Sequence, residues 1–486
     1  MIWGNFLHIY QPANQIKEIF DKVVSECYLP LFKSLVDNPK SKITLNINAA
    51  LTERLVDYPE VLDNLKKAAS NRQIEFTDSA KYHTLLPFLP EDEIERQITL
   101  NRETNKKILG DCYSPIGFFP PEMAYSPKIL PILEKLGYEW LIMDEIGRIG
   151  QVGQIGPIGK TYKIKGSKMN VFFRERGPSN LIMSAMVRCE EDLKYYLKDE
   201  YGKKGYMVTG MDGETFGHHR PGLQSLLTEL LVSKEFDHAF FSELLQLFPE
   251  TETVTPVVST WASSQKDIEE GIQFISWDEP DNQIQRFQWE LQRLVLEKVK
   301  DDTGEARKKL DMGLASDQFF WASAKPWWSL EVIELGAWTL LDALKSLPDP
   351  DQKIIERAYD LYLKIIAMAF EWQRTGKVRE ISKQMKDVPR IPFKDKTKTE
   401  PWVYNAFIDL LKQSMKEAAK KENFEEAILW RDAIWKIETK NDVFDAVHAI
   451  DLLRIQIPGT EILNIIDKHR KEYERLVSGQ PEQRAI

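Results

Sequence analysis

The feature that most constrains the fold is a change of hydrophobic periodicity near residue 260 of this 486-residue chain. Before that point, short apolar runs alternate with amphipathic stretches, which is typical of repeated strand–helix units around a mainly parallel sheet. The apolar runs predict strands at Trp3–His8, Lys42–Asn48, Gln73–Thr77, Ile116–Phe119, Trp140–Asp144 and Tyr206–Thr209. The stretches between them predict helices such as Leu51–Ser70 and Glu91–Leu109, and Tyr162–Arg174 is predicted to form a β-hairpin.

After about residue 280 the periodicity is helical almost to the end of the chain. Apolar residues recur on one helix face, for example at Ile284, Phe287, Leu291, Leu294 and Val299. Breaks occur at Pro348–Pro350 and at the Lys- and Pro-rich stretch Val388–Pro401. We therefore expect an α/β fold with a strand–helix barrel over residues 1–265, followed by an all-α helical domain over residues 266–486.

The charge balance limits the partners of the protein. Lys and Arg total 65 while Asp and Glu total 75, giving a net charge of −10, and nucleic acids and anionic membranes repel such a surface. No apolar run approaches the roughly 18 residues of a membrane span, and the opening sequence MIWGNFLHIYQP lacks the features of a signal peptide. Three scattered cysteines form no disulfide framework or CxxC metal motif. We expect a cytoplasmic protein that binds neither nucleic acid nor membrane.

Polar clusters follow several of the predicted strands, where functional side chains of parallel α/β folds gather. The opening strand runs into His8 and, three residues later, Gln11. His8 is a site residue in one interpretation and a packed core histidine in the other. The second cluster contains Glu75 and, further on, His83. Glu75 either faces a barrel interior, where it needs a partner, or faces solvent.

Two further clusters carry carboxylates. Glu122 directly follows Pro120-Pro121, and prolines restrict the motion of the loop that carries it. The same tripeptide is also a plausible helix start, with Glu122 near the positive end of the helix dipole. Asp212 and Glu214 lie two residues apart and precede His218-His219. An Asp-Gly turn is the structural alternative there, but no second strand follows to complete a hairpin.

Taken together and in order, these segments resemble the motifs of glycoside hydrolase family 57. The resemblance rests on five segments over roughly residues 1–330: Tyr10-Gln11-Pro12, the strand with Glu75, Gly117–Glu122, Met211–Glu214 and Ala315–Ala322. It implies a (β/α)7 barrel followed by a helical domain that contributes to the substrate groove around residues 315–330. It also implies retaining chemistry on α-glucans, with no cofactor and no metal ion.

The same resemblance implies roles for individual residues. Glu122 matches the nucleophile and Asp212 the general acid/base, while His8, Glu75, Asp317 and Trp321 fall on substrate-contact positions. Two departures stand out. Tyr10 replaces the second histidine of a His-x-His-Gln-Pro motif, and Phe320 occupies the usual aromatic position beside Trp321, so that the stacking residue can shift by one.

Other residues are candidates for binding the sugar. His8, His83 and His218 can orient hydroxyl groups, together with Gln11, and Glu214 is placed to raise the pKa of Asp212 by its charge. The chain contains 13 Trp and 16 Tyr, and such rings stack on sugar faces or pack in a core. Trp261, Trp327 and Trp328 are candidates for acceptor subsites, with core packing as the alternative.

We expect an α-amylase-like enzyme if water accepts the sugar, and a 4-α-glucanotransferase or branching enzyme if a sugar hydroxyl does. A metal-dependent polysaccharide deacetylase is a rival class, because Asp212 and the histidines could bind one ion. It also needs an Asp-Asp pair near the first strand and a His-x3-His helix, and the sequence contains neither. The non-enzymatic rival is a catalytically silent glucan-binding homologue, which loss of Glu122 or Asp212 would indicate; both are present.

Overall fold

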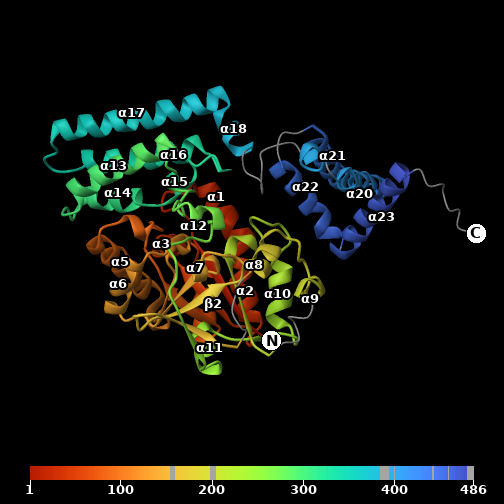
Figure 1. Ribbon diagram of the computed structural model, residues 1–486, viewed down its shortest axis with the longest axis horizontal. Helices are drawn as coiled ribbons and strands as arrows, with labels where there is room; N and C mark the ends of the chain where they lie inside the picture. The colour runs from red at the N-terminus through yellow and green to blue at the C-terminus, as the bar shows by residue number, and fades with distance from the viewer. Residues whose placement is uncertain are drawn as a thin grey trace, which may run out of the picture.

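The structure is a computed structural model with three parts, a sheet surrounded by helices, a helical layer against it, and a terminal helical bundle (Figure 1). The description covers residues 1–153, 159–197, 204–325, 327–383, 393–398, 400–439, 443–457 and 459–478. Part of the predicted break at Val388–Pro401 lies outside the described residues.

A curved ten-stranded sheet forms the first part, in the order β10-β6-β7-β5-β4-β3-β2-β1-β8, with β9 paired to β1. Neighbours from β7 through β5, β4, β3, β2 and β1 to β8 are all parallel, and β6 is antiparallel to β7. The bounds are β1 Ile2–Ile9, β2 Ile43–Ile47, β3 Ile74–Asp78, β4 Gly117–Phe118, β5 Trp140–Asp144, β6 Thr161–Ile164, β7 Asn170–Arg174, β8 Tyr206–Asp212, β9 Asp237–His238 and β10 Thr251–Val254. The predicted α/β, barrel-like fold class is confirmed, as are the predicted strands and the β6–β7 hairpin.

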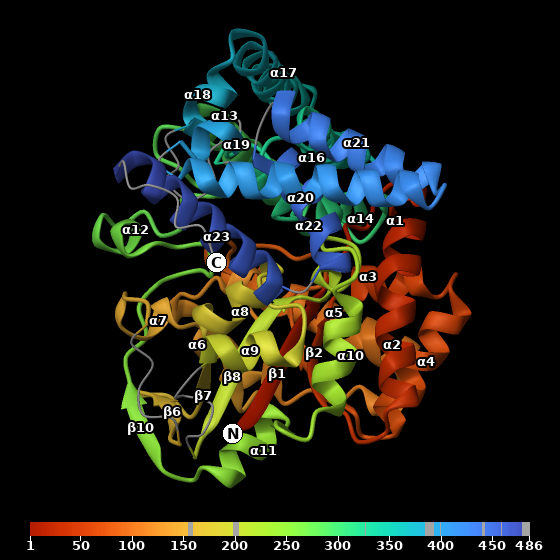
Figure 2. The same cartoon turned by 90° about the vertical axis from the view of Figure 1, so that its right-hand side faces the viewer.

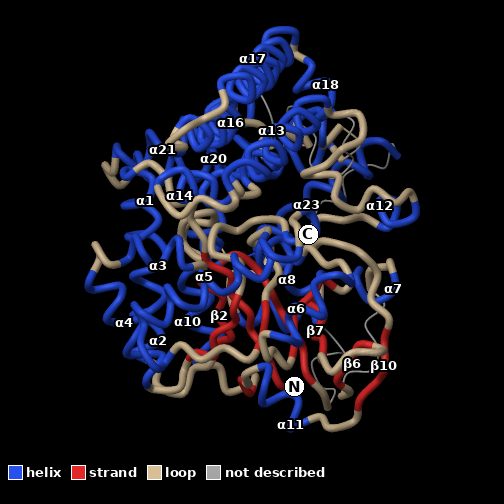
Figure 3. Tube along the Cα trace, turned by 90° about the vertical axis from the view of Figure 1, so that its left-hand side faces the viewer, coloured by secondary structure: helices blue, strands red, loops and turns tan. Residues whose placement is uncertain are grey.

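Helices cover the sheet between the strands, as the blue and red segments of Figure 3 show. They are α1 Lys17–Val23, α2 Leu29–Asp37, α3 Ala49–Leu55, α4 Pro59–Ser70, α5 Glu91–Leu109, α6 Leu130–Lys135, α7 Ile146–Ile149, α8 Arg176–Met183, α9 Glu190–Leu197, α10 Gln224–Val232 and α11 Phe241–Leu247. Helix α12, Gln265–Glu269, follows the last strand. The single helix predicted over Leu51–Ser70 is wrong, because the chain breaks before Pro59, which begins α4. A proline lacks the N–H that would continue the first helix, and it suits the first turn of a new one.

The helical layer packs directly on the sheet part. It contains α13 Gln283–Val299, α14 Glu305–Gly313, α15 Asp317–Phe320, α16 Leu330–Lys345, α17 Gln352–Thr375 and α18 Lys377–Lys383. Buried residues of the sheet, such as Leu141 and Met143, share one hydrophobic cluster with Leu291 of α13 and Leu340 of α16. The layer is therefore continuous with the core of the sheet part.

The terminal bundle has its own core. It contains α19 Phe393–Lys396, α20 Pro401–Lys420, α21 Phe424–Thr439, α22 Val443–Gln456 and α23 Gly459–Ser478. Phe407 and Leu411 of α20, Trp430 of α21 and Leu453 of α22 form a separate buried cluster. Figure 2 shows α22 and α23 between α20 and the sheet part.

A buried carboxylate secures the carboxyl end of β3. Asp78 is fully buried, and it accepts hydrogen bonds from Asn101 Nδ2 at 2.6 Å, Arg102 Nε at 3.1 Å and Tyr113 OH at 3.1 Å. Tyr138 OH also donates to it. Helix α5 and the segment that precedes β5 are thereby tied to the end of β3, where the functional side chains gather.

We expect Asp78→Ala to destabilise the sheet part by about 3–5 kcal/mol, because it leaves the Arg102 guanidinium without its carboxylate. Thermal melting followed by near-UV circular dichroism measures the effect. The exposed Asp111 provides the control, since Asp111→Ala removes the same charge without a buried network. Equal melting temperatures for the two variants would contradict the role of Asp78.

Candidate active site

Strand register brings the site together. His8 lies opposite Asp212 across the β1–β8 pair and opposite Asn46 across the β1–β2 pair, and Asn46 lies opposite Thr77 of β3. These strands are parallel, so the residues that end them share one edge of the sheet. Asp212 is the last residue of β8.

Glu122 reaches the same edge from a short 3₁₀ turn, Pro121–Met123. Its backbone has a φ of 61°, the left-handed region that non-glycine residues seldom adopt. The indole Nε1–H of Trp261 donates a 2.7 Å hydrogen bond to Glu122 Oε2, and the Trp261 backbone N–H donates to the Glu122 carbonyl oxygen at 3.3 Å. A strained backbone and a held carboxylate are common where a side chain must keep one position for function.

Four carboxyl groups gather around this edge: Glu214 is buried, and Glu122, Asp212 and Asp317 are partly buried. Burial, together with the charge of Asp212, raises the pKa of Glu122 to about 8 and that of Glu214 to about 8. Burial also raises the pKa of Asp212 and of Asp317. A low-polarity environment disfavours several charges at once, so these carboxyl groups ionise together less readily than they would in water.

Two basic side chains act in the opposite direction. His8, when protonated, and Arg174 lower the pKa of Asp212 and partly offset its burial, while burial lowers the pKa of His8 itself. Arg174 is itself held by Asp144, whose Oδ2 accepts from Nη1 at 2.9 Å, and Arg176 Nε donates to the other oxygen of Asp144 at 2.6 Å. Asp212 therefore lies between groups that favour its neutral form and groups that favour its charge.

A stack of rings forms one wall of the site. The ring of His8 lies 4.5 Å from Phe119 and 4.9 Å from His83, and the ring of Tyr10 lies 4.3 Å from His83. Tyr10 OH donates a 2.8 Å hydrogen bond to Asp317 Oδ2. Tyr10, which replaces the histidine of the motif, thus links the first strand to α15 of the helical layer.

His83 contacts both Glu122 and the helical layer. Its Nδ1 lies 3.7 Å from Glu122 Oε1 and 3.1 Å from Ser316 Oγ. Burial lowers the pKa of His83 well below its ordinary value, so the ring is neutral at pH 7. Its Nε2 is buried without a protein hydrogen-bond partner, which leaves a polar atom for a ligand.

Glu214 and Gln11 lie close to the central group. Glu214 Oε1 accepts from Tyr10 N at 3.1 Å and from Tyr28 OH. Gln11 is buried and accepts from Gln15 at 3.1 Å. His218 lies further along the loop after Asp212, where its Nδ1 is 2.8 Å from Glu26 Oε2.

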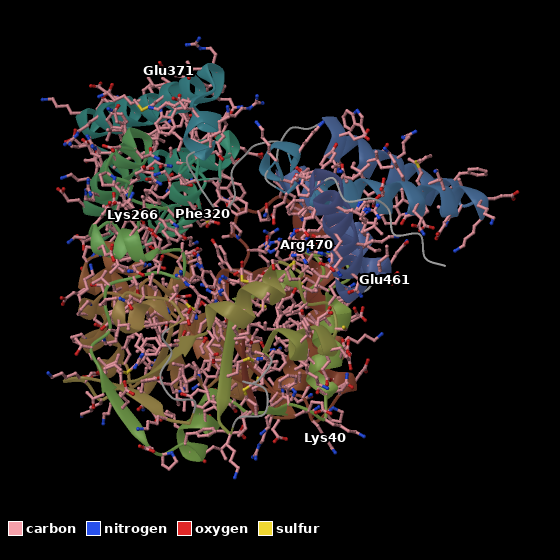
Figure 4. All side chains as sticks on the ribbon, turned by 45° about the vertical axis from the view of Figure 1, so that its right-hand side comes forward. Lys40, Lys266, Phe320, Glu371, Glu461 and Arg470 are labelled. Carbon is pink, nitrogen blue, oxygen red and sulfur yellow. The ribbon has the colours of Figure 1, made fainter. Side chains whose placement is uncertain are left out.

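The predicted tryptophans separate into two groups. Trp321 and Trp327 form a half-buried aromatic set with Phe320, with centroid distances of 5.6–6.2 Å. Figure 4 places Phe320 where the helical layer meets the sheet part. Trp328 instead stacks on Trp372 at 5.9 Å in the core of the helical layer, so the core-packing alternative describes it.

Glu75 is not brought into this group. It is the second residue of β3 and lies opposite Thr44, three residues before Ile47 ends β2. Its carboxylate accepts from Thr44 Oγ1 at 3.2 Å and from Ser242 N at 3.3 Å in the first turn of α11. Backbone N–H groups at a helix N-terminus are natural partners for a carboxylate, and this contact faces the opposite end of the strand from Asp212.

Sequence reasoning missed Arg174, Asp144 and Tyr28. Asp144 and Arg174 are the last residues of β5 and β7, so the rule that located the other polar clusters also applied to them. Tyr28 lies in a helical segment that precedes β2, and no local pattern distinguishes it. Among the described residues, no group of three or more His, Cys, Asp or Glu side chains is arranged to hold a metal ion.

The carboxyl groups lie together beside stacked rings, at the edge where the parallel strands end. A site of this class is suited to acid–base and nucleophilic chemistry. Comparison with known proteins is more specific: residues 5–255 match the glycosyl hydrolase family 57 profile. The chain belongs to that family. Residues 405–440, in α20 and α21, match the UvrB/uvrC motif.

Curated relatives are distant. An α-amylase of Pyrococcus horikoshii is 26% identical over 233 residues, which cover 47% of this chain and 36% of the relative. A protein of Methanocaldococcus jannaschii described as a putative α-amylase is 24% identical over 313 residues, covering 60% of this chain and 64% of the relative. The chain thus spans less than two thirds of the length of both proteins.

Solved structures support the fold. A 4-α-glucanotransferase of Thermococcus litoralis has a TM-score of 0.57 at 18% identity, covering 72% of this chain and 59% of that protein. A family 57 branching enzyme of Thermococcus kodakaraensis has a TM-score of 0.58 at 16% identity, covering 76% of this chain and 96% of that protein.

Among the described residues, no helix is long and apolar enough to cross a membrane.

We expect Glu122→Gln to stabilise the protein at pH 7 by about 1–3 kcal/mol. The pKa of Glu122 is raised from 4.5 to about 8 on folding, so the wild type loses stability as pH rises from 4.5 toward 8, whereas glutamine does not ionise. Denaturation at pH 4.5, 7 and 8 measures the difference, which should vanish at the lowest pH. Glu60→Gln at an exposed position is the control; a pH-independent difference for Glu122→Gln would contradict the prediction.

Proposed function

We propose that the protein is a retaining glycosidase that acts on α-1,4-glucans, in the manner of an α-amylase. The observation that carries the proposal is the convergence of Glu122 and Asp212 on one sheet edge, close enough that the charge of Asp212 raises the pKa of Glu122. Family membership supports it. In this proposal residues 1–265 form the catalytic domain, and the helical region of residues 266–486 completes the groove around residues 315–330 through its α13–α18 layer.

In the first step Glu122 is the nucleophile. Retaining enzymes hold two carboxyl groups about 5–5.5 Å apart on either side of the scissile bond. Because burial raises the pKa of Glu122 to about 8, the reactive form is the one in which Glu122 is ionised and Asp212 holds the proton. In that form the Glu122 carboxylate attacks the anomeric carbon while Asp212 transfers its proton to the leaving glycosidic oxygen, and the C–O bond breaks. The 2.7 Å hydrogen bond from Trp261 stabilises the charged form of Glu122 and fixes its direction.

In the second step Asp212 acts as a base, so that the direction of proton transfer is reversed. The Asp212 carboxylate takes a proton from the acceptor hydroxyl, whose oxygen attacks the anomeric carbon. The ester bond to Glu122 breaks and the carboxylate is regenerated. The charge of Arg174, which lowers the pKa of Asp212, favours its ionised form at this stage.

In this scheme the surrounding residues bind the sugar. The free Nε2 of His83 and the Asp317 carboxylate are proposed to bind hydroxyl groups, with His8, Gln11 and Glu214 supporting them. Trp321 and Trp327 are proposed to stack on the glucan, because their rings stay half-buried. Trp261 is proposed to hold Glu122 through its indole N–H.

Transfer to a sugar hydroxyl is the second candidate, since a 4-α-glucanotransferase and a branching enzyme have the same fold. Chromatography of maltooligosaccharide digests, with parallel assay of reducing ends, separates the outcomes. New reducing ends indicate hydrolysis, and redistribution of chain length without them indicates transfer. A wild-type protein with neither activity would be a silent glucan-binding homologue.

We also propose a cytoplasmic location, because Cys27, Cys112 and Cys189 are free thiols.

We expect Asp212→Asn to lower kcat by about 10²–10⁴-fold, the usual contribution of a general acid/base, and Glu122→Gln to lower it by at least about 10⁴-fold. A substrate with an activated leaving group needs no protonation, so it should restore the first step in Asp212→Asn and not in Glu122→Gln. Initial rates on maltooligosaccharide and on an activated aryl glycoside test this. Glu60→Gln is the control. An unchanged rate in Glu122→Gln would exclude Glu122 as the nucleophile.

A further inference from the structure

The terminal bundle contacts the loop that follows Asp212, at residues 213–222. We propose that Asp451 of α22 is a positioning residue, an anchor that docks the terminal bundle on the sheet part and holds this loop in its active conformation. The inference rests on the proposed function, because it takes Asp212 as the acid/base.

Asp451 is almost completely buried, with 2% of its surface exposed. Two arginines of the sheet part converge on it: Arg188 Nη2 lies 3.1 Å from Oδ1, and Arg220 Nη1 lies 2.9 Å from Oδ2. Arg454, one turn along the same helix, lies 3.8 Å from Oδ1. One carboxylate of the bundle therefore serves three guanidinium groups.

Close contacts surround this ion-pair cluster. Arg454 Nη1 donates to the Ser184 carbonyl oxygen at 3.1 Å. Gly222 has a φ of 81°, and a Cβ at this position would lie 2.9 Å from Ile455 Cγ1. The backbone of the loop is thus packed against the side of α22, and glycine is the residue that permits both this conformation and this approach.

The same arginines also hold the loop itself. Arg188 Nη1 donates to the Pro221 carbonyl oxygen at 3.1 Å, and Arg220 Nε donates to the Met183 carbonyl oxygen at 2.9 Å. At the other end of the loop, His219 N donates to the Glu214 carbonyl oxygen at 2.8 Å, and the Glu214 carboxylate lies in the site. A continuous set of bonds joins Asp451 to Glu214.

The negative charge of Asp451 compensates the buried arginines around it. Burial lowers the pKa of Arg188 and of Arg454, and the charge of Asp451 counteracts this. Removing one partner of a buried ion pair is strongly destabilising, because it leaves a charge without compensation. Since the bundle has a core of its own, we expect loss of Asp451 to loosen the bundle from the loop while both parts stay folded.

The proposed mechanism puts the leaving group and the acceptor beside Asp212, from which the loop begins. Asp212 exchanges its proton with the oxygen of that group, and the chain runs directly from Asp212 into the loop. Release of the loop therefore weakens binding of the glucan chain more than it slows the chemical step. We expect Asp451→Asn to raise KM for maltooligosaccharide at least fivefold while kcat changes less than threefold.

The experiment compares Asp451→Asn with Asp467→Asn in the full-length protein. Asp467 is a partly exposed aspartate of the same bundle, paired with Arg470 and Lys471 on α23. Amide hydrogen exchange of residues 215–222 is measured together with KM and kcat. The anchor predicts at least tenfold faster exchange in this loop for Asp451→Asn alone, with unchanged exchange in α20. Asp451→Glu, which keeps the charge, is expected to restore part of the protection.

Exchange that stays unchanged in Asp451→Asn overturns the proposal, and so does faster exchange with an unchanged KM. If Asp451→Asn does not fold, Ile455→Ala replaces it, because that variant loosens the contact without leaving a charge unpaired. Hydrogen exchange requires no turnover, so an inactive wild type would overturn the proposed function while the exchange data still test the anchor.

Discussion

The register of the parallel strands is the constraint on which the rest of the structure depends. Because β1, β2, β3 and β8 run in the same direction with aligned ends, His8, Asn46 and Asp212 meet at one edge. A shift of one residue in any pair would turn these side chains to the other face of the sheet. The buried network around Asp78 reinforces this arrangement next to the site.

Concentrating carboxyl groups at that edge carries a cost in stability. Glu122, Asp212, Glu214 and Asp317 all have raised pKa values because they are buried. The protein offsets this with a few directed contacts, among them the indole N–H of Trp261 and the hydroxyl of Tyr10. Strained, destabilised groups of this kind are expected where function and stability compete.

The two helical parts contact the sheet part in different ways. The α13–α18 layer supplies Asp317 and the aromatic set at Trp321 and Trp327, and it shares its core with the sheet. The terminal bundle folds around a separate core and meets the sheet part through Asp451. This difference in packing is consistent with the proposal that the layer contributes to the site while the bundle acts on it through the loop.

The sequence by itself determined the fold class and the strand positions, and it indicated the carboxylates Glu122, Asp212 and Glu214, to which the family resemblance added Asp317. These follow from local patterns, since polar residues after apolar strands must gather where parallel strands end. Only the tertiary structure decided that Tyr10 bonds to Asp317, that Trp261 holds Glu122, that Glu75 binds the start of α11, and that Asp451 meets Arg220. Such pairs join residues far apart in the chain, and their contacts depend on how whole elements pack, which no local periodicity encodes.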